Sequence, residues 1–378
     1  MKIKDKLFLC LVLIPSSLLI QVTGNAQSKS DVLSEMNLAN TYWQLNNKPQ
    51  VRAFWDYAAY QTGNMELFLL TKNEAYKKYA TEWAIYNKWM GAKSTDRSKW
   101  KYTYGETDDY VLFGDWQICF QTYIDLYQID EQEHMIARAK EVMEYQMSTP
   151  NTNYWWWADG LYMVMPVMTK LYKVTGDQKY LDKLHEYFMY ANSIMYDGDD
   201  KLYYRDAKYV YPKHKSANGK KDFWARGDGW VFAGLAKVLK DLPSKDPHRE
   251  EFLSKYKGMA DAILKSQQQA GYWTRSMLDA AHAPGAETSG TAFFTYGLLW
   301  GINNGYLKEK KYLKAAKKGW GYLSKVALQA DGKVGYVQPI GEKAIPGQLV
   351  DANSTANFGV GAFLLAGCEM YRFLSNQK

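Results

Sequence analysis

The sequence predicts an all-α fold in which six helical hairpins close into a ring, the (α/α)6 barrel. Apolar residues recur at helical spacing through most of the chain beyond residue 26. Many of the resulting helices are joined in pairs by very short polar turns. The pairs recur at irregular intervals of roughly 45–70 residues, which is too long and uneven for the common short solenoid repeats. A solenoid of helix pairs is the competing arrangement.

The helical periodicity defines the expected elements to within a few residues at each end. We expect helices over residues 31–46, 55–71, 75–91, 109–128, 131–147, 160–174, 177–195, 227–242, 248–267, 288–304, 309–326 and 355–374.

The turns within pairs differ from the links between pairs. Turn residues such as Gly176-Asp177 and Asn304-Gly305 join the two helices of a pair. Function usually lies on long loops that a rigid scaffold holds, so we expect a site on the face that carries the long links. These links, some with short β-like runs, cover residues 93–108, 148–159, 196–226, 268–287 and 327–354.

Composition limits the class of protein. The chain has 378 residues, of which 47% are apolar, 16% aromatic and 23% charged, so it can bury a large core and is not disordered. The formal charge is +7, but the basic residues are spread along the chain, which argues against a nucleic-acid partner. Five His and three Cys are scattered, so we expect no metal site, no cofactor and no disulfide framework. Cys119 and Cys368 are expected to be buried free thiols.

The first 26 residues have the pattern of a secretory signal peptide. Lys2, Lys4 and Lys6 precede an apolar stretch over residues 7–20, and small residues follow at a cleavage site. A membrane anchor is the alternative, but the apolar run is short and interrupted. We therefore expect an exported protein with no later membrane span, and a single catalytic domain over residues 27–378.

A carboxyl beside three tryptophans is the first candidate for chemistry. Asp159 follows Trp155, Trp156 and Trp157 and directly precedes an apolar helix. It could be a helix N-cap, which would lower its pKa. Alternatively, burial among indoles would raise its pKa and let it keep a proton near neutrality, as a general acid requires.

A second group of carboxyls lies at the start of an earlier helix. Asp108, Asp109 and Asp115 cluster there, and a preference for acidic residues at helix starts explains one or two of them. A carboxylate that faced Asp159 would complete an acid/base pair for sugar chemistry. The spacing alone does not show which of them faces it.

A third segment places an arginine between aromatics and glycines. Trp224, Arg226 and Trp230 suggest recognition of an anion or a sugar ring, and a packed tryptophan pair with a surface arginine is the alternative. Weaker candidates, each with an equally good structural explanation, are Tyr203, Arg205, Asp206, Trp55, Tyr57 and Tyr60. Residues 287–297 look like a helix start capped by Ser or Thr.

Five segments form an ordered set between about Trp55 and Glu369: WWWADGLYMVMP, YYRDA, DFWARGDGWVFAGL, ETSGTAFFTYGLLWGI and DANSTANFGVGAFLLAGCE. Together they resemble the unsaturated rhamnogalacturonyl hydrolases, glycoside hydrolase family 105, which share a fold with the unsaturated glucuronyl hydrolases. The resemblance implies an (α/α)6 barrel and an exolytic enzyme that removes the 4,5-unsaturated uronic acid left by polysaccharide lyases. The substrate would be an oligosaccharide, with rhamnogalacturonan the favoured source, and no obligate protein partner is implied.

The same resemblance assigns roles to residues. The general acid/base falls on Asp159, and its neighbouring aromatic on Trp157. A second functional carboxylate falls on Asp109, with Asp108 beside it. The sugar subsite falls on Trp224, Arg226 and Trp230, and we add Tyr203, Arg205, Trp55 and Tyr60 as candidates for substrate binding.

The implied chemistry is hydration of the C4=C5 double bond, with no metal. Asp159 would protonate C4 and then help water add to C5, after which the resulting hemiketal opens and the neighbouring sugar leaves. Arg226 is our hypothetical partner for the substrate carboxylate or hydroxyls, because a guanidinium fork fits such groups. Enzymes that trim imported oligosaccharides in this way usually work in the periplasm, so we expect that location.

Two other classes of function compete with this interpretation. One is a different enzyme on the same barrel, such as an inverting glycosidase or a sugar epimerase, which would leave the unsaturated chromophore unchanged. The other is a non-catalytic glycan-binding or helical-repeat protein, which would need the aromatic loops but no acid.

Overall fold

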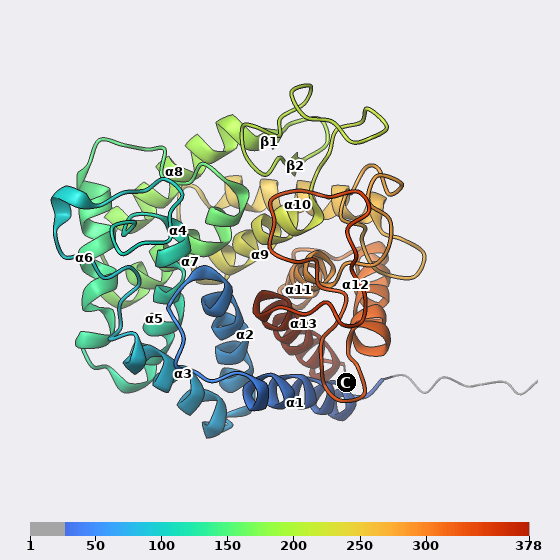
Figure 1. The fold of residues 1–378 in the computed structure, drawn as a ribbon, viewed down its shortest axis with the longest axis horizontal. Coiled ribbons are helices and arrows are strands. Elements are labelled where there is room, and N and C mark those ends of the chain that lie inside the picture. The colour runs from blue at the N-terminus through green and yellow to red at the C-terminus, as the bar shows by residue number, and fades with distance from the viewer. Residues whose placement is uncertain (1–26, 378) are drawn as a thin grey trace, which may run out of the picture.

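In the computed structural model, which describes residues 27–377, the helices alternate along the chain between an outer and an inner ring (Figure 1). The six outer helices are α1 (Lys29–Asn46), α3 (Glu74–Tyr86), α6 (His134–Ser148), α8 (Lys179–Met195), α10 (Arg249–Ser266) and α12 (Lys310–Tyr322). The inner ring contains α2 (Trp55–Thr71), α4 (Gly114–Gln117) continued by α5 (Cys119–Asp130), α7 (Ala158–Thr175), α9 (Ala225–Asp241), α11 (Thr288–Asn303) and α13 (Asn357–Ser375). The predicted (α/α)6 barrel is therefore confirmed.

The ring closes where the first inner helix meets the last. At Gly63 on α2, a Cβ atom would lie 2.2 Å from the carbonyl oxygen of Gly361 on α13. At Gly361, a Cβ atom would lie 2.4 Å from the carbonyl oxygen of Ala59. Real Cβ atoms do not approach backbone this closely, so glycine at both positions lets the two helices pack with their backbones in contact.

The connections fall into two populations, as the sequence predicts. Each inner helix leads into the next outer helix through a short turn at one end of the barrel, whereas each outer helix leads into the next inner helix through a longer link at the other end. The links contain the only strands among residues 27–377, an antiparallel pair of β1 (Tyr196–Asp197) and β2 (Leu202–Tyr203), and a 3-10 turn, η1 (Arg97–Lys99). Cys119 and Cys368 are buried free thiols, as expected.

Three helix boundaries differ from those expected, each for a local reason. The helix expected over 109–128 begins at Gly114, because the backbone of Asp108 and Asp109 accepts hydrogen bonds from Ser94 and Lys101 in the preceding link. The helix expected to reach residue 91 ends at Tyr86, because Lys88 and Trp89 adopt positive φ angles. The helix expected over 309–326 changes to a π-turn, η2 (Leu323–Ala327), in which Leu328 N bonds Leu323 O.

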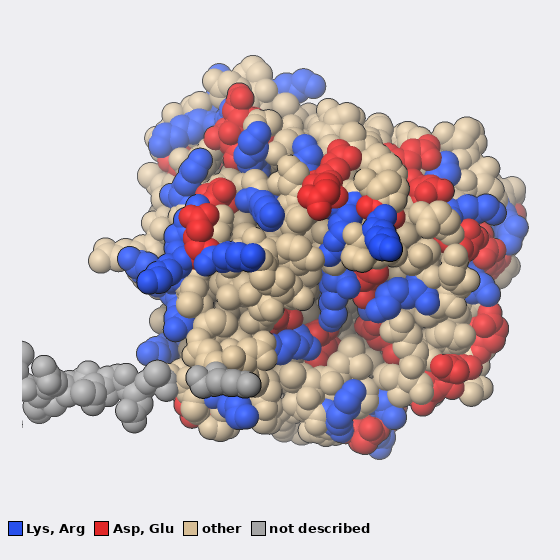
Figure 2. Space-filling view, turned by 180° about the vertical axis from the view of Figure 1, so that it is seen from behind, with Lys and Arg blue, Asp and Glu red and all other residues tan. Residues whose placement is uncertain are grey.

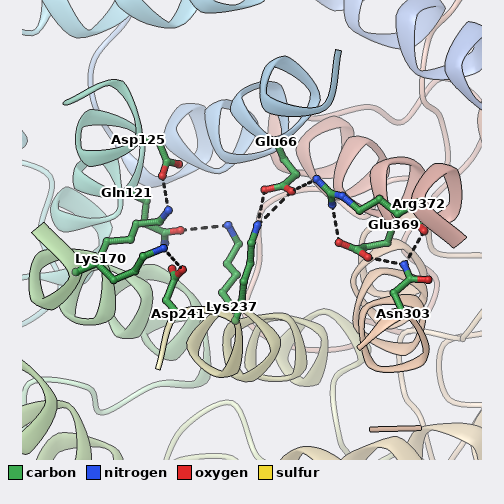
Figure 3. Close-up of polar contacts among 11 residues, drawn as sticks. Glu66, Gln121, Asp125, Lys170, Lys237, Asp241, Asn303, Glu369 and Arg372 are labelled. Atoms are coloured by element: carbon green, nitrogen blue, oxygen red, sulfur yellow. Dashed lines mark hydrogen bonds and ion pairs between the residues drawn. The ribbon is translucent and has the colours of Figure 1, made fainter. Parts of the chain in front are cut away.

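The short-turn end of the barrel is held by a network of ion pairs (Figure 3). Glu66 on α2 accepts hydrogen bonds from Arg372 on α13 and from Lys240 on α9. Lys170 on α7 pairs with Asp125 on α5. Lys237 on α9 donates to Gln121 on α5 and so connects the two groups. Viewed from behind Figure 1, Lys and Arg side chains are interspersed with Asp and Glu side chains around the middle of the molecule (Figure 2). The network therefore joins α2, α5, α7, α9 and α13 at the short-turn end.

Two of the expectations concern membranes and export. None of the helices within residues 27–377 is both long enough and apolar enough to cross a membrane. The predicted signal peptide over residues 1–26 lies outside the described residues.

Candidate active site

A cavity of about 470 Å³ opens at the long-link end of the barrel, where α2, α4 and α7 begin. This volume is typical of sites for small molecules. Five of the long links contribute to it, together with the first turns of α2 and α4 and the first two turns of α7. The lining residues are Arg52, Phe54, Trp55, Asp56, Tyr104, Glu106, Asp115, Trp156, Trp157, Asp159, Met163, Arg205, Lys208, Ile340, Gly341 and Glu342.

Two buried carboxyls lie at the base of the cavity. Asp115 is the second residue of α4 and Asp159 is the second residue of α7, and they are 5% and 8% exposed. Within residues 27–377, Asp115 Oδ1 and Asp159 Oδ2 are buried without a hydrogen-bond partner. Trp157 is the N-cap residue of α7, so Asp159 does not have the alternative role of an N-cap. Each carboxyl therefore has an oxygen available to a ligand.

The surroundings of these carboxyls raise their pKa values. Burial is the largest cause for Asp115, and repulsion by Asp159 adds to it, so the pKa of Asp115 lies well above its usual value. Burial also raises the pKa of Asp159, but the neighbouring Arg205 and Arg226 oppose the rise. Burial thus favours the protonated form of both carboxyls, and Asp159 is the member that ionises more readily.

Aromatic rings surround the carboxyls. The ring of Trp157, only 1% exposed, packs against Phe113 at 4.7 Å and Trp156 at 4.8 Å between centroids. On the other side of the cavity, Trp55 stacks on Phe358 at 5.3 Å. These rings reduce the access of water to the carboxyls and offer flat apolar faces to a sugar ring.

Arg205 is held beside Asp159 by backbone pairing between two links. The amide of Ala158 donates to the carbonyl oxygen of Arg205 at 2.7 Å, and Trp157 forms an antiparallel bridge with Asp206. The Arg205 Nη1 atom donates to Asp206 at 2.6 Å, and its Nε lies 3.6 Å from Asp159 Oδ2, beyond hydrogen-bond distance. Arg205 Nε is buried and has no hydrogen-bond partner within the described chain, so this cation, which lines the cavity, retains an unused donor beside Asp159.

The mouth of the cavity carries exposed ion pairs. Arg52 bonds Glu106 at 2.8 Å, and Lys208 bonds Glu342 at 3.2 Å. Glu342 also accepts from the hydroxyl of Tyr209 at 2.5 Å and lies 3.5 Å from Arg205. These contacts of Glu342 hold residues 340–342 at the mouth of the cavity.

Four of the residues that the sequence suggested line the cavity together: Asp159, Trp157, Arg205 and Trp55. Asp108 and Asp109 do not. Asp108 is exposed and accepts from the amide of Lys93, and the carbonyl of Asp109 bonds Lys101 in the same link. This corrects the expectation that Asp109 faces Asp159, because the helix begins after both residues and Asp115 takes that position.

Arg226 does not present its guanidinium to the cavity. It is 1% exposed, lies between the rings of Trp224 and Phe358, and donates to the carbonyl oxygens of Gln338 at 2.6 Å and Pro339 at 2.9 Å. Trp224 donates to the side chain of Gln338 at 2.8 Å. These contacts correct the expectation of a substrate-binding Arg226 and Trp224, because both residues hold the last long link in place.

Three further candidates are part of the core and do not line the cavity. Trp230 is fully buried beneath Trp55, against Tyr162 and Phe293. Tyr203, also fully buried, donates its hydroxyl to Asn192, and Tyr60 donates to Asn40. The hydroxyls of the two tyrosines are therefore used inside the protein, and the ring of Trp230 is covered by other aromatic rings. This corrects the expectation that these three residues bind substrate.

Sequence reasoning left Asp115 open as one of three candidate partners of Asp159, and the resemblance then favoured Asp109. It missed Asp56, Glu342 and Lys208 as lining residues. One signal could have found the carboxyls: an aromatic residue two positions before an aspartate at three inner-helix starts, in FWD (54–56), FGD (113–115) and WAD (157–159). The expected Ser or Thr cap of the helix at 288 is instead Glu287, which accepts from the amides of Ser289 and Gly290. Among residues 27–377, no cluster of His, Cys, Asp and Glu is arranged to hold a metal ion.

Comparison with known protein families identifies one match over almost the whole described chain. The model of "Glycosyl Hydrolase Family 88" matches residues 28–374. A curated relative, the "Unsaturated 3S-rhamnoglycuronyl hydrolase" of Formosa agariphila, is 41% identical over 222 residues. That match covers 58% of this chain and 58% of the relative, so the chain spans little more than half the length of this curated protein.

Two solved structures are similar over nearly the full chain. A glycosyl hydrolase family 88 protein from Bacteroides vulgatus is 59% identical, with a TM-score of 0.90, and the match covers 92% of this chain and 100% of that one. A structure described as a polysaccharide lyase is 64% identical, with a TM-score of 0.91, over 93% of this chain and 99% of that one.

Proposed function

Since this chain belongs to Glycosyl Hydrolase Family 88, we propose that it removes a 4,5-unsaturated uronic acid from the non-reducing end of lyase-generated oligosaccharides. The observation that carries this proposal is the pair of buried carboxyls, Asp115 and Asp159, at the base of an aromatic cavity. The name of the relative from Formosa agariphila supports rhamnose as the sugar next to the uronide.

Asp159 supplies and recovers the proton. A general acid/base must change its protonation state in each turnover, which suits the member of the pair that ionises more readily. Asp159 transfers its proton to C4, and positive character develops at C5 beside the ring oxygen. The ionised Asp159 then takes a proton from water as the water oxygen bonds C5. The hemiketal opens to a ketone at C5, and the hemiacetal left at C1 releases the neighbouring sugar.

Asp115 has a different role, because its pKa lies well above the usual value. In its protonated form, which burial favours, it donates a hydrogen bond to the substrate or to the attacking water. Its own proton also prevents a second negative charge beside the ionised form of Asp159.

Arg205 replaces Arg226 as the partner of the substrate carboxylate. Arg205 lines the cavity and its Nε lies 3.6 Å from Asp159 Oδ2, which matches the position of a carboxylate attached to C5. Trp55 and Trp156, which are half-buried, provide the faces on which the sugar ring stacks, and Trp157 packs against Trp156.

A measurement of the ultraviolet band of the conjugated alkene tests this proposal. Incubation with an unsaturated glucuronyl-rhamnose disaccharide should remove the band and release rhamnose. An unchanged band would contradict hydration and favour an inverting glycosidase, an epimerase or a glycan-binding protein.

The same assay separates a second candidate, a polysaccharide lyase, which the description of the 64% identical structure favours. A lyase abstracts the C5 proton of a saturated uronide and eliminates the sugar at C4, so it creates the alkene. A saturated uronic-acid polymer should therefore gain the band with a lyase and stay unchanged with a hydrolase.

We also propose that the protein is exported and works in the periplasm. The composition of residues 1–26, which lie outside the described residues, supports this location. Sequencing the N-terminus of the protein purified from a periplasmic extract should find cleavage after Ala26. An intact N-terminus in a cytoplasmic extract would contradict the proposal.

A further inference from the structure

The six inner helices place their second residue at equivalent positions around the ring. These residues are Asp56, Asp115, Asp159, Arg226, Ser289 and Phe358. The first three line the cavity, whereas the last three do not. Arg226 bonds two loop carbonyls, Ser289 donates to Glu287, and Phe358 stacks beneath Trp55. The cavity is thus the half of the ring in which three aspartates are available to a ligand.

Asp56 is the member of this set that the proposed function does not use. Its Oδ2 accepts a hydrogen bond from Asn357 Nδ2 on α13 at 3.0 Å, which fixes the orientation of the carboxyl. Its Oδ1 is buried and has no partner within residues 27–377. Burial raises the pKa of Asp56. It lies next to Trp55, the ring of which forms one face of the cavity.

The charges of the cavity orient a sugar ring relative to Asp56. The inner helices follow the order α2, α4, α7, so Asp56 and Arg205 lie on either side of the pair formed by Asp115 and Asp159. Arg52, the charge of which acts on Asp56, is paired with Glu106, whereas Arg205 Nε has no partner among the described residues, so a substrate carboxylate would be attracted to Arg205. With the C5 edge of an unsaturated uronide at Arg205, the edge that carries the C2 and C3 hydroxyls faces α2.

We propose that Asp56 is a specificity-determining residue that accepts a hydrogen bond from the C2 or C3 hydroxyl of the unsaturated uronide through its free Oδ1. The proposal rests on the proposed function and adds a residue that selects the hydroxyl edge of the ring. Asn357 acts on it as a positioning residue, because its amide holds Asp56 Oδ2 and leaves Oδ1 without a partner among the described residues.

The test uses Asp56→Asn with an unsaturated glucuronyl-rhamnose disaccharide and its 2-deoxy and 3-deoxy analogues. In the variant, the new amide keeps its oxygen on Asn357 and turns its NH2 group to the cavity, so an acceptor becomes a donor. We expect kcat/KM to fall by ~10- to 100-fold, mainly through KM, as the loss of a hydrogen bond to a carboxylate predicts. One deoxy analogue should lose a similar factor with the wild type and no further factor with the variant.

Controls separate this role from a structural link between α2 and α13. Asp182→Asn, at an exposed acidic position in the first turn of the outer helix α8, should leave KM unchanged. If both deoxy analogues match the parent disaccharide with the wild type, the proposal is overturned, whether or not the variant folds. If Asp56→Asn and the wild type lose the same factor with each analogue, Asp56 is only structural. A wild type that never removes the alkene overturns the proposed function and this proposal with it.

Discussion

The two ends of the barrel both bury carboxyls, but they treat them in opposite ways. At the short-turn end, Glu66 lies between Lys240 and Arg372, and these cations lower its pKa despite its burial (Figure 3). At the long-link end, burial raises the pKa values of Asp115 and Asp159, and each carboxyl keeps an oxygen without a partner among residues 27–377. The carboxyls are buried to a similar extent at the two ends. Their pKa values shift in opposite directions because Glu66 has two cations as partners, whereas Asp115 and Asp159 do not.

The same helices carry both kinds of site. The helix α2 begins with Asp56 in the cavity and places Glu66 in the ion-pair network, and α7 likewise carries Asp159 and Lys170. Charges that are paired stabilise the ring, whereas charges left unpaired cost stability and are available for chemistry. Substitutions at the two ends should therefore affect different properties of the molecule.

The largest effect is expected for Asp159→Asn. Loss of a general acid/base should lower turnover by at least ~10²–10⁴-fold, because the amide can neither donate to C4 nor accept from water. The disappearance of the alkene band measures this loss, and the melting temperature should not fall. Asp109→Asn is the matched control: it lies outside the cavity and should keep wild-type turnover. Near-normal turnover of Asp159→Asn would remove Asp159 from the mechanism.

The next effect is expected at the opposite end. Glu66→Gln leaves Arg372 and Lys240 without their anion and should lower the free energy of unfolding by about 3 kcal/mol, the lower end of the range for a broken buried pair, because both cations are partly exposed. Urea unfolding measures this change, and kcat of the folded variant should stay at the wild-type value. Glu82→Gln, which breaks an exposed pair with Lys78, should cost less than about 0.5 kcal/mol. Equal losses in the two variants would show that the network adds no stability.

A third prediction concerns pH. Because the pKa of Asp115 is raised in the folded state, its contribution to stability is present below the unfolded value of 3.8 and is lost as pH rises through the folded pKa. Asp115→Asn removes this loss, so the variant should gain stability relative to the wild type as pH increases from 4 to 8. Each unit of raised pKa corresponds to about 1.4 kcal/mol above both values. Unfolding free energies at pH 4, 6 and 8 measure the gain, and a difference that stays constant with pH would contradict the raised pKa.

Features of the molecule that depend on local sequence could be predicted, whereas those that depend on distant segments could not. The fold was accessible because it depends on helical periodicity and on the lengths of turns and links, and both are local properties. Asp159 and Trp157 could also be identified from local sequence, because they lie two residues apart at the start of a helix. The role of Arg226 was wrong because its partners, the carbonyls of Gln338 and Pro339, lie in a distant link. Asp115 could not be chosen over Asp109 because the path of the link over residues 87–113 decides which of them faces Asp159.

The smallest expected effect concerns the most weakly paired cation of the ion-pair network. Lys237 makes one hydrogen bond, to Gln121 at 3.3 Å, and burial together with the nearby Lys170 lowers its pKa to about 8. Between about pH 8 and 10.5 the unfolded chain binds more protons than the folded one at this site, so the wild type gains stability as pH rises through that range. Lys237→Met removes this dependence. It should stabilise the protein by about 1 kcal/mol at pH 7, with an advantage that shrinks toward pH 10, because an unpaired buried charge costs more than an apolar side chain. Unfolding free energies of both proteins at pH 7 and pH 10 measure the effect. An advantage that does not change with pH would show that the pKa of Lys237 is not lowered, and would contradict the prediction.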